Sequence, residues 1–349
     1  MKISKLYANN TSFKMIRFDK GINFILSQNN GVGKSSLFKL IDFCLLGDKG
    51  FLANEHFKDY IFYIELQIAS NRYITIKRPT IGGKNIELKI TKEKSILLDE
   101  KSFNKKGSLG VAKSFLENKV NYSINKFRTY ITYFLRDENN QDHPFILNRF
   151  ANAHESEYKT VISNLIGIDG RKIKRKYDLE KQIEKLETNS TEVKVLKNDL
   201  EKQIEENKTL ITNHFIEKLQ INISKYGKIV LDKDISFLIG FNASNDIEFS
   251  IGTEIDNKLL SFIFEAALAD TYAQKRLIKF VAFDCPFDED KNIYEEGIYD
   301  AIYELYRRGI QTIITSNESA IHNQQNLIEI KDEFLTGFLS NDDKLMGEF

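Results

Sequence analysis

Residues 27–36 combine the residue types that hold the phosphate groups of a nucleotide. They read Ser-Gln-Asn-Asn-Gly-Val-Gly-Lys-Ser-Ser. Glycines let backbone N–H groups surround a phosphate, while Lys34 can reach the terminal phosphates and the Ser35 hydroxyl can ligate Mg²⁺. We therefore expect a phosphate-binding loop here. Its candidate nucleotide-binding residues are Asn30, Gly31, Gly33, Lys34, Ser35 and Ser36.

The flanking sequence supports this interpretation, although Gln28 stands where the usual pattern has glycine. Residues 22–26 form an apolar strand pattern before the loop. The apolar residues after it follow a helical period that begins at Leu37. A strand, a glycine-rich loop and a helix in this order are typical of a phosphate site. The alternative is an ordinary glycine-rich turn that precedes a lysine.

A carboxylate usually completes the magnesium site of such a loop. Residues 277–283 are apolar except for Lys279, which is typical of a parallel strand buried on both faces. Asp284 follows directly, at the end where parallel sheets bind ligands. We therefore expect Asp284 and Ser35 to hold the metal. Gln141 is a further candidate for positioning metal or water, although a solvated loop also explains its polar surroundings.

Composition excludes several classes of protein. The 349 residues are 42% hydrophobic, with 50 basic and 50 acidic side chains and two cysteines. We expect a folded cytoplasmic protein without a membrane span, a disulfide framework or a cysteine-based zinc site. Because the net charge is zero, any DNA contact must come from a local basic patch. Residues 171–176 are one candidate, although such a run also suits a solvated helix face.

The N-terminal half alternates strand and helix patterns. Residues 3–7 and 13–18 predict strands that lead into the sheet carrying the loop. Residues 61–68 and 73–77 predict a hairpin, and residues 86–90 add a strand, so this part is an antiparallel β lobe. Helices are expected between residues 108 and 168, with Val111, Phe115 and Leu116 on one apolar face.

The C-terminal half begins with a lysine- and glutamate-rich stretch, residues 171–219, whose apolar spacing of three, four or seven favours a coiled coil. A pair of amphipathic surface helices is the alternative. Strand patterns follow at residues 228–231 and 247–250, and a helix at residues 259–268. One more helix then ends at Gly309, and a buried strand spans residues 310–315.

The order of these parts resembles the ABC-type ATPase heads of the SMC, RecF and RecN kind. It is similar in particular to ATPase components of bacterial ABC-three-component systems, some of which defend against phage. The segments that carry the resemblance are residues 5–10, 30–35, 42–47, 133–136 and 283–286.

The resemblance implies an α/β fold: a P-loop ATPase head with a mixed sheet, helices and an antiparallel β lobe, plus a short inserted coiled-coil hairpin. Residues 1–168 and 223–349 would form the two halves of the head, and residues 169–222 the coiled coil.

The same resemblance implies that ATP and Mg²⁺ are held between two heads. Ser250 and Gly252, in residues 249–253, match the signature motif that would cap the γ-phosphate from the second subunit. The segment is otherwise consistent with a strand-to-helix turn in which these residues form an N-cap.

Two departures from the family pattern affect catalysis. Cys285 occupies the place of the catalytic glutamate beside Asp284, and a thiol cannot orient water as a carboxylate can. Ser316 stands where many members have histidine. Asp288 or Glu289 could act as the polarising acid instead.

Two functions therefore stay open. One is an ATPase that dimerises on nucleotide and acts in DNA repair or antiviral defence with slow hydrolysis. The other is a nucleotide-gated switch that controls a partner effector. The predicted partners are a second copy of the chain, possible DNA and proteins encoded nearby.

Overall fold

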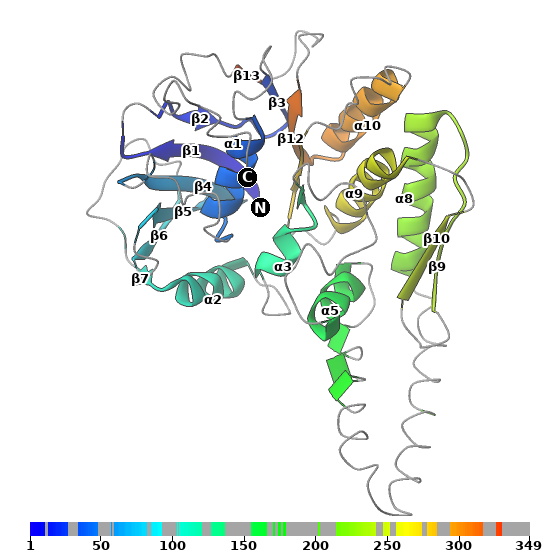
Figure 1. The fold of residues 1–349 in the computed structure, drawn as a ribbon, viewed down its shortest axis with the longest axis horizontal. Helices are drawn as coiled ribbons and strands as arrows, with labels where there is room; N and C mark the ends of the chain where they lie inside the picture. The colour runs from blue at the N-terminus through cyan, green and yellow to red at the C-terminus, as the bar shows by residue number, and fades with distance from the viewer. Residues whose placement is uncertain are drawn as a thin grey trace, which may run out of the picture.

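The computed structural model describes residues 1–10, 13–26, 34–47, 57, 59–81, 85–92, 103, 105–120, 127–136, 155–165, 170–171, 174–175, 177–178, 202, 214–241, 247–251, 256–273, 278–284, 294–316 and 326–329. Within these residues two large sheets lie on one side of the molecule, and three long helices lie on the other (Figure 1).

The first sheet is antiparallel and six-stranded. Its strands, in spatial order, are β2 (Ile16–Arg17), β1 (Lys2–Ala8), β4 (Ile61–Ala69), β5 (Arg72–Pro79), β6 (Ile86–Thr91) and β7 (Lys105–Gly107). The predicted β4–β5 hairpin and the β6 strand are confirmed. The expectation that the first strands join the sheet carrying the loop is wrong, because β1 pairs with β2 and β4 in this antiparallel lobe.

The second sheet is five-stranded, and every strand pair in it is parallel. Its order is β13 (Asn326–Glu329), β3 (Ile22–Leu26), β12 (Gln311–Ser316), β11 (Phe280–Phe283) and β8 (Leu135–Arg136). The predicted burial of β11 on both faces is confirmed, since all four of its residues are buried. Because the strands run parallel, their carboxyl ends share one edge.

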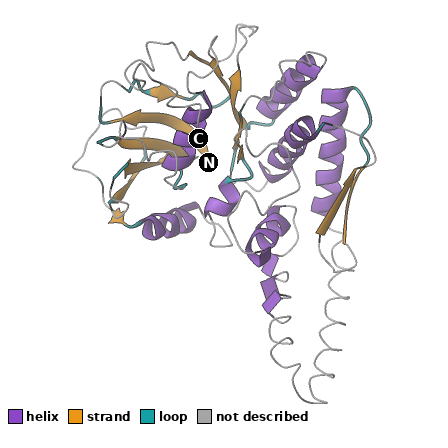
Figure 2. Ribbon diagram, viewed as in Figure 1, coloured by secondary structure: helices purple, strands orange, loops and turns teal. Residues whose placement is uncertain are grey.

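Some of the helices pack on these sheets, and the three long ones lie together in a layer of their own. The helices are α1 (Lys34–Cys44), α2 (Leu109–Val120), α3 (Phe127–Ile131), α5 (Glu155–Leu165), α8 (His214–Leu231), α9 (Asn257–Ala273) and α10 (Glu295–Arg307). Figure 2 shows α8, α9 and α10 side by side, with a hairpin of β9 (Phe237–Phe241) and β10 (Ile247–Ile251) beside α8. The helices predicted before Gly309 and around residues 259–268 are confirmed.

Two sequence predictions for helical segments are wrong. Residues 228–231 are the last turn of α8, not a strand, because their apolar side chains continue a helical spacing that already buries Ile216, Leu219 and Ile223. In α2, Leu116 is buried, but Val111 is 52% exposed and does not lie on the apolar face. The predicted coiled coil of residues 169–222 falls mostly outside the described residues.

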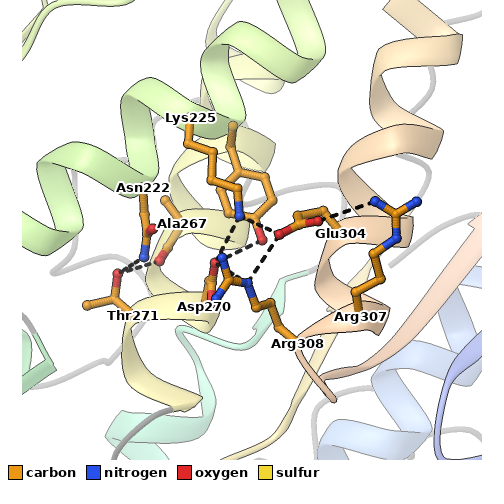
Figure 3. Close-up of polar contacts among 9 residues, drawn as sticks. Asn222, Lys225, Ala267, Asp270, Thr271, Glu304, Arg307 and Arg308 are labelled. Atoms are coloured by element: carbon orange, nitrogen blue, oxygen red, sulfur yellow. Dashed lines mark hydrogen bonds and ion pairs between the residues drawn. The ribbon is translucent and has the colours of Figure 1, made fainter.

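An ion cluster ties the three long helices together (Figure 3). It consists of Lys225 from α8, Asp270 from α9, and Glu304 and Arg308 from the end of α10. Lys225 Nζ lies 2.6 Å from Glu304 Oε1 and 3.5 Å from Asp270 Oδ2. Arg308 Nε lies 3.1 Å from the same glutamate oxygen. Two cations and two anions therefore join α8, α9 and α10, and we call these four residues the helix ion cluster.

Candidate functional site

The strand and helix that should flank the phosphate loop are both present. β3 is the second strand of the parallel sheet, and α1 begins at Lys34. The apolar face predicted for this helix is confirmed by the burial of Leu37, Leu40 and Ile41. Lys34 thus stands in the first turn of a helix, where backbone N–H groups and the helix dipole favour an anion. Ser36 is buried at the same end.

Two arginines hold the other end of α1. The guanidinium of Arg78, 1% exposed, donates to the carbonyl oxygens of Phe43 and Gly47 and lies 3.8 Å from the centre of the Phe43 ring. Arg128 Nη2 lies 2.7 Å from Asp42 Oδ1. Cations at this end complement the carbonyl groups of the last helical turn. α1 is therefore fixed to the antiparallel lobe through β5 and to α3, which sets the position of its first turn.

The close approach of Asp42 requires glycine at position 47, directly after α1. A Cβ atom at this position would lie 2.0 Å from Asp42 Oδ2, the carboxylate that also binds Arg128. Cys44, in the last turn of the helix, is buried, and burial raises the pKa of its thiol well above the ordinary value. This cysteine is therefore a neutral packing residue.

Asp284 lies directly after β11 and is 1% exposed. Thr315 on the neighbouring strand β12 donates from Oγ1 to Asp284 Oδ1 at 2.7 Å. The parallel register makes this contact possible, because Phe283 is level with Ile314 and Ser316 is level with Leu26 of β3. Asp284, Thr315 and the end of β3 therefore lie at one edge of the sheet. The strand that Asp284 follows, β11, is two strands away from β3.

Thr315, which contacts the candidate site residue Asp284, is not singled out by the sequence analysis. Its signal was present, because Thr315 is the last residue of the buried run at residues 310–315 and sits beside the predicted site residue Ser316. What the sequence lacks is the strand order, which places β12 next to β11 and brings the hydroxyl to the carboxylate.

The remaining predicted site residues are only partly described. Ser316 is the last residue of β12, and Ser35 belongs to α1, but the side chains of both lie outside the described residues. The residues wholly outside them are Asn30, Gly31, Gly33, Gln141, Gly252, Cys285, Asp288 and Glu289. Their assignments stay predictions.

The N-terminus of α9 differs from the predicted arrangement. Ser250 lies within strand β10, paired with Leu238 of β9, and α9 begins only at Asn257. The cap is Asp256, whose Oδ1 accepts from the backbone N–H groups of Lys258 at 2.9 Å and Leu259 at 3.4 Å. A Ser250 cap is therefore wrong, and the first N–H groups of α9 are already bound by a carboxylate.

The donor set at the sheet edge fits a nucleotide with Mg²⁺. Magnesium in such sites takes one or two protein oxygens plus phosphate oxygens and water. Asp284 offers a buried carboxylate, Ser35 in α1 has a hydroxyl that could ligate the metal, and Lys34 in the same turn could supply positive charge for the phosphates. Among the described residues no group of three or more His, Cys, Asp or Glu could hold a metal ion.

Comparison with solved structures finds chains of similar length at low identity. One is an SMC head bound to the C-terminal winged-helix domain of ScpA, with 14% identity, 91% of each chain covered and a TM-score of 0.49. Another is the recombination mediator protein RecF of the RecFOR pathway, with 13% identity, 95% of this chain and 96% of that chain covered, and a TM-score of 0.45. A third is a Pyrococcus furiosus Smc head domain with an extended coiled coil, bound to the C-terminal domain of ScpA. Its identity is 15%, the coverage is 90% of this chain and 89% of that chain, and the TM-score is 0.43.

No curated protein matches the sequence. In the part of the chain that the structure describes, none of the helices has the length and apolar character needed to span a membrane.

The family comparison is decisive for the fold. A family model described as an AAA domain matches residues 7–336, which include the candidate phosphate loop, the parallel sheet, the helical layer and all of the antiparallel sheet except most of β1. The match and the parallel sheet confirm the predicted ATPase-head fold and support nucleotide binding, usually with Mg²⁺. The chain belongs to this AAA domain family.

Proposed function

We propose that the chain binds ATP and Mg²⁺ at the carboxyl edge of its parallel sheet, dimerises on nucleotide, and acts in DNA repair or antiviral defence with slow hydrolysis. The observation that carries the nucleotide site is the Asp284–Thr315 contact, two strands from the β3–α1 connection. It puts a buried carboxylate at the edge where Lys34 begins its helix.

Each residue has a defined role in this proposal. Lys34 binds the terminal phosphates, while Ser35 and Asp284 hold the metal and Thr315 orients the Asp284 carboxylate. The bound Mg²⁺ would neutralise charge on the phosphates. A second copy would supply Ser250 and Gly252 toward the γ-phosphate, and β10 carries Ser250 on a hairpin beside α8.

The test of this proposal is nucleotide binding by Lys34→Ala, which we expect to lose ATP affinity because the mobile positive charge is gone. The matched control is Lys39→Ala on the same helix. Light scattering with ATP and Mg²⁺ then reports the dimer. Unchanged ATP affinity in Lys34→Ala would contradict the nucleotide site, and a parent that stays monomeric at saturating ATP would contradict the dimer.

Cys285 favours a second candidate function, a nucleotide-gated switch that controls a partner effector without working on DNA itself. A thiol in the place of the general base predicts slow turnover. If that place faces the attacking water, Cys285→Glu should raise turnover by roughly 10²–10⁴-fold with little change in affinity. If Asp288 or Glu289 already polarises the water, Asp288→Asn or Glu289→Gln should abolish turnover instead. Steady-state hydrolysis by the three variants separates these outcomes.

A further inference from the structure

Three lysines lie close together at the amino edge of the parallel sheet, opposite the carboxyl edge where we propose that the nucleotide binds. Lys20 precedes β3, Lys279 precedes β11, and Lys2 begins β1. Lys279 N donates to Met1 O at 2.9 Å, and Lys2 Nζ donates to Lys20 O at 2.7 Å. The start of β1 therefore lies beside both loops, and Lys2 stands between the other two lysines. We call Lys2, Lys20 and Lys279 the lysine edge.

The register of the sheet sets the spacing of the lysine edge. Gln311 N of β12 donates to Lys279 O at 2.8 Å, and Thr312 N donates to Gly21 O at 3.1 Å. β12 thus separates the two loops, which places the backbones of Lys20 and Lys279 about 10 Å apart at the usual strand spacing. Within the described part of the chain, these three lysines form no ion pair with a carboxylate.

Two buried amide side chains hold this arrangement rigid. Asn23 Oδ1 accepts from Asp19 N at 2.7 Å, and its Nδ2 donates to Gly21 O at 3.0 Å. Gln311 Nε2 donates to Ile3 O at 2.7 Å and to Asp19 O at 2.6 Å. Asn23 and Gln311 are both fully buried. The turn that carries Lys20 is therefore fixed to β1 and β12.

Like charges are held together here at an electrostatic cost. Burial, and then the ammonium groups of Lys279 and Lys20, lower the pKa of Lys2 to about 8. A bound anion would offset this repulsion. Asp19, exposed in the same turn, is the described acid nearest in sequence to Lys20.

An exposed aromatic ring adjoins the lysine edge. Tyr306, near the end of α10, is 53% exposed, and its ring lies so close to Gly21 that a Cβ atom there would be 2.7 Å from Tyr306 Cε2. Arg307, also exposed, follows it. Lysines beside an aromatic ring suit a nucleic-acid strand, whose phosphates bind the cations while a base stacks on the ring. An acidic peptide would use the lysines but not the ring.

We propose that the lysine edge and Tyr306 bind the phosphate backbone and a base of a nucleic-acid strand. Lys279 directly precedes the four residues of β11, and Asp284 directly follows them. Lys279 and Asp284, which mark the two edges, are therefore about 16 Å apart along this strand at 3.3 Å per residue. Because the sites are separate, nucleic-acid binding at the lysine edge does not require ATP.

The test uses the full chain without nucleotide and a fluorescently labelled single-stranded oligothymidine, whose anisotropy is measured over a series of KCl concentrations. The double variant Lys20→Gln/Lys279→Gln should bind about tenfold more weakly at low salt. Its slope of log K against log[KCl] should be shallower by about 1.4, since each lost phosphate contact on a single strand contributes about 0.7.

The matched control is Lys92→Gln/Lys105→Gln, which removes the same charge from two exposed lysines, one directly after β6 and one at the start of β7, and should keep the parent slope. Tyr306→Leu should weaken binding about fivefold without changing the slope, because stacking releases no counterions. Circular dichroism verifies that each variant is folded.

Three results would overturn the proposal: equal slopes in the two double variants, unchanged affinity in Tyr306→Leu, or a parent that binds polyglutamate but not the oligonucleotide. The last would identify an acidic protein as the partner. Lys34→Ala should retain binding in this assay, so failure of the nucleotide site is distinguishable from failure at the lysine edge.

Discussion

Asp284 and Asp270 are both buried, 1% and 2% exposed, but they differ in what binds them. Asp284 Oδ1 accepts a hydrogen bond from the neutral hydroxyl of Thr315 on a neighbouring strand. Asp270 lies 3.5 Å from Lys225 and 3.7 Å from Arg308, inside a cluster with equal numbers of cations and anions. Tyr226 adds a hydrogen bond from its hydroxyl at 3.3 Å.

The difference separates a structural carboxylate from one suited to a ligand. A buried charge next to cations from other helices has its charge offset within the protein, and removing it leaves those cations unbalanced. A carboxylate oriented by a hydroxyl at the carboxyl edge of a parallel sheet lies where such sheets bind ligands and offers an oxygen of the kind that Mg²⁺ prefers. We therefore expect Asp270 to contribute to stability and Asp284 to nucleotide binding.

The largest effect on stability should come from Asp270→Ala. The variant leaves Lys225 and Arg308 without their shared carboxylate between α8, α9 and α10. Removing one partner of a fully buried pair costs about 3–5 kcal/mol, and partial exposure of both cations reduces the expected loss to about 2–3 kcal/mol. Urea denaturation measures it.

The matched control is Asp234→Ala, which breaks the Lys228–Asp234 pair, in which Asp234 is 89% exposed. It should change the free energy of unfolding by less than about 0.5 kcal/mol. Equal losses in the two variants would contradict the role assigned to the helix ion cluster.

A smaller effect is expected for Thr315→Val, a change of nearly constant volume. It removes the hydrogen bond to Asp284, and a single intramolecular hydrogen bond contributes about 0.5–1.5 kcal/mol. It should also weaken Mg²⁺-dependent ATP binding, because the carboxylate loses its orientation. Thr312→Val on the same strand is the control. Thr312 is equally buried, and its hydroxyl makes no hydrogen bond to the described residues.

Thr312→Val should therefore be neutral or slightly stabilising. If Thr315→Val matched Thr312→Val in both its free energy of unfolding and its ATP affinity, the Asp284–Thr315 contact would contribute to neither stability nor nucleotide binding.

The contrast between these two aspartates could be predicted only in part from the sequence. Asp284 stands out because a continuous apolar strand ends at it. Asp270 carries no such signal. It lies in a mostly apolar helix, and its partners are 45 residues before it and 38 after it, by the numbering of Lys225 and Arg308. Helical periodicity predicts which face of α9 is buried but not which cations meet it.

The same limit explains the errors at residues 3–7 and 228–231. The local sequence pattern predicts that β1 is a strand. Which sheet β1 joins depends on its pairing with β4, more than fifty residues later in the chain. β-branched residues 229 and 230 favour a strand, yet packing of α8 against α9 and α10 keeps them helical. Long-range packing decided both outcomes.

The smallest effect concerns the pH dependence of the helix ion cluster. The hydrogen bond from Lys225, followed by that from Arg308, holds the pKa of Glu304 below its ordinary value of 4.5. A lowered carboxylate pKa stabilises the folded state above the unfolded value, and the contribution is lost as pH falls through the folded value. Glu304→Gln should therefore flatten the stability curve below pH 4.5. Parallel curves for parent and variant would contradict this.

The most direct test of the central claim is calorimetric titration of Asp284→Asn with ATP, with and without Mg²⁺. Asparagine keeps an acceptor for Thr315, so we expect the free energy of unfolding to change by less than about 1 kcal/mol. The parent should bind ATP more tightly with Mg²⁺, and the variant should bind equally with or without it. A variant that keeps the full Mg²⁺ dependence of the parent would show that the metal is held elsewhere and contradict the site.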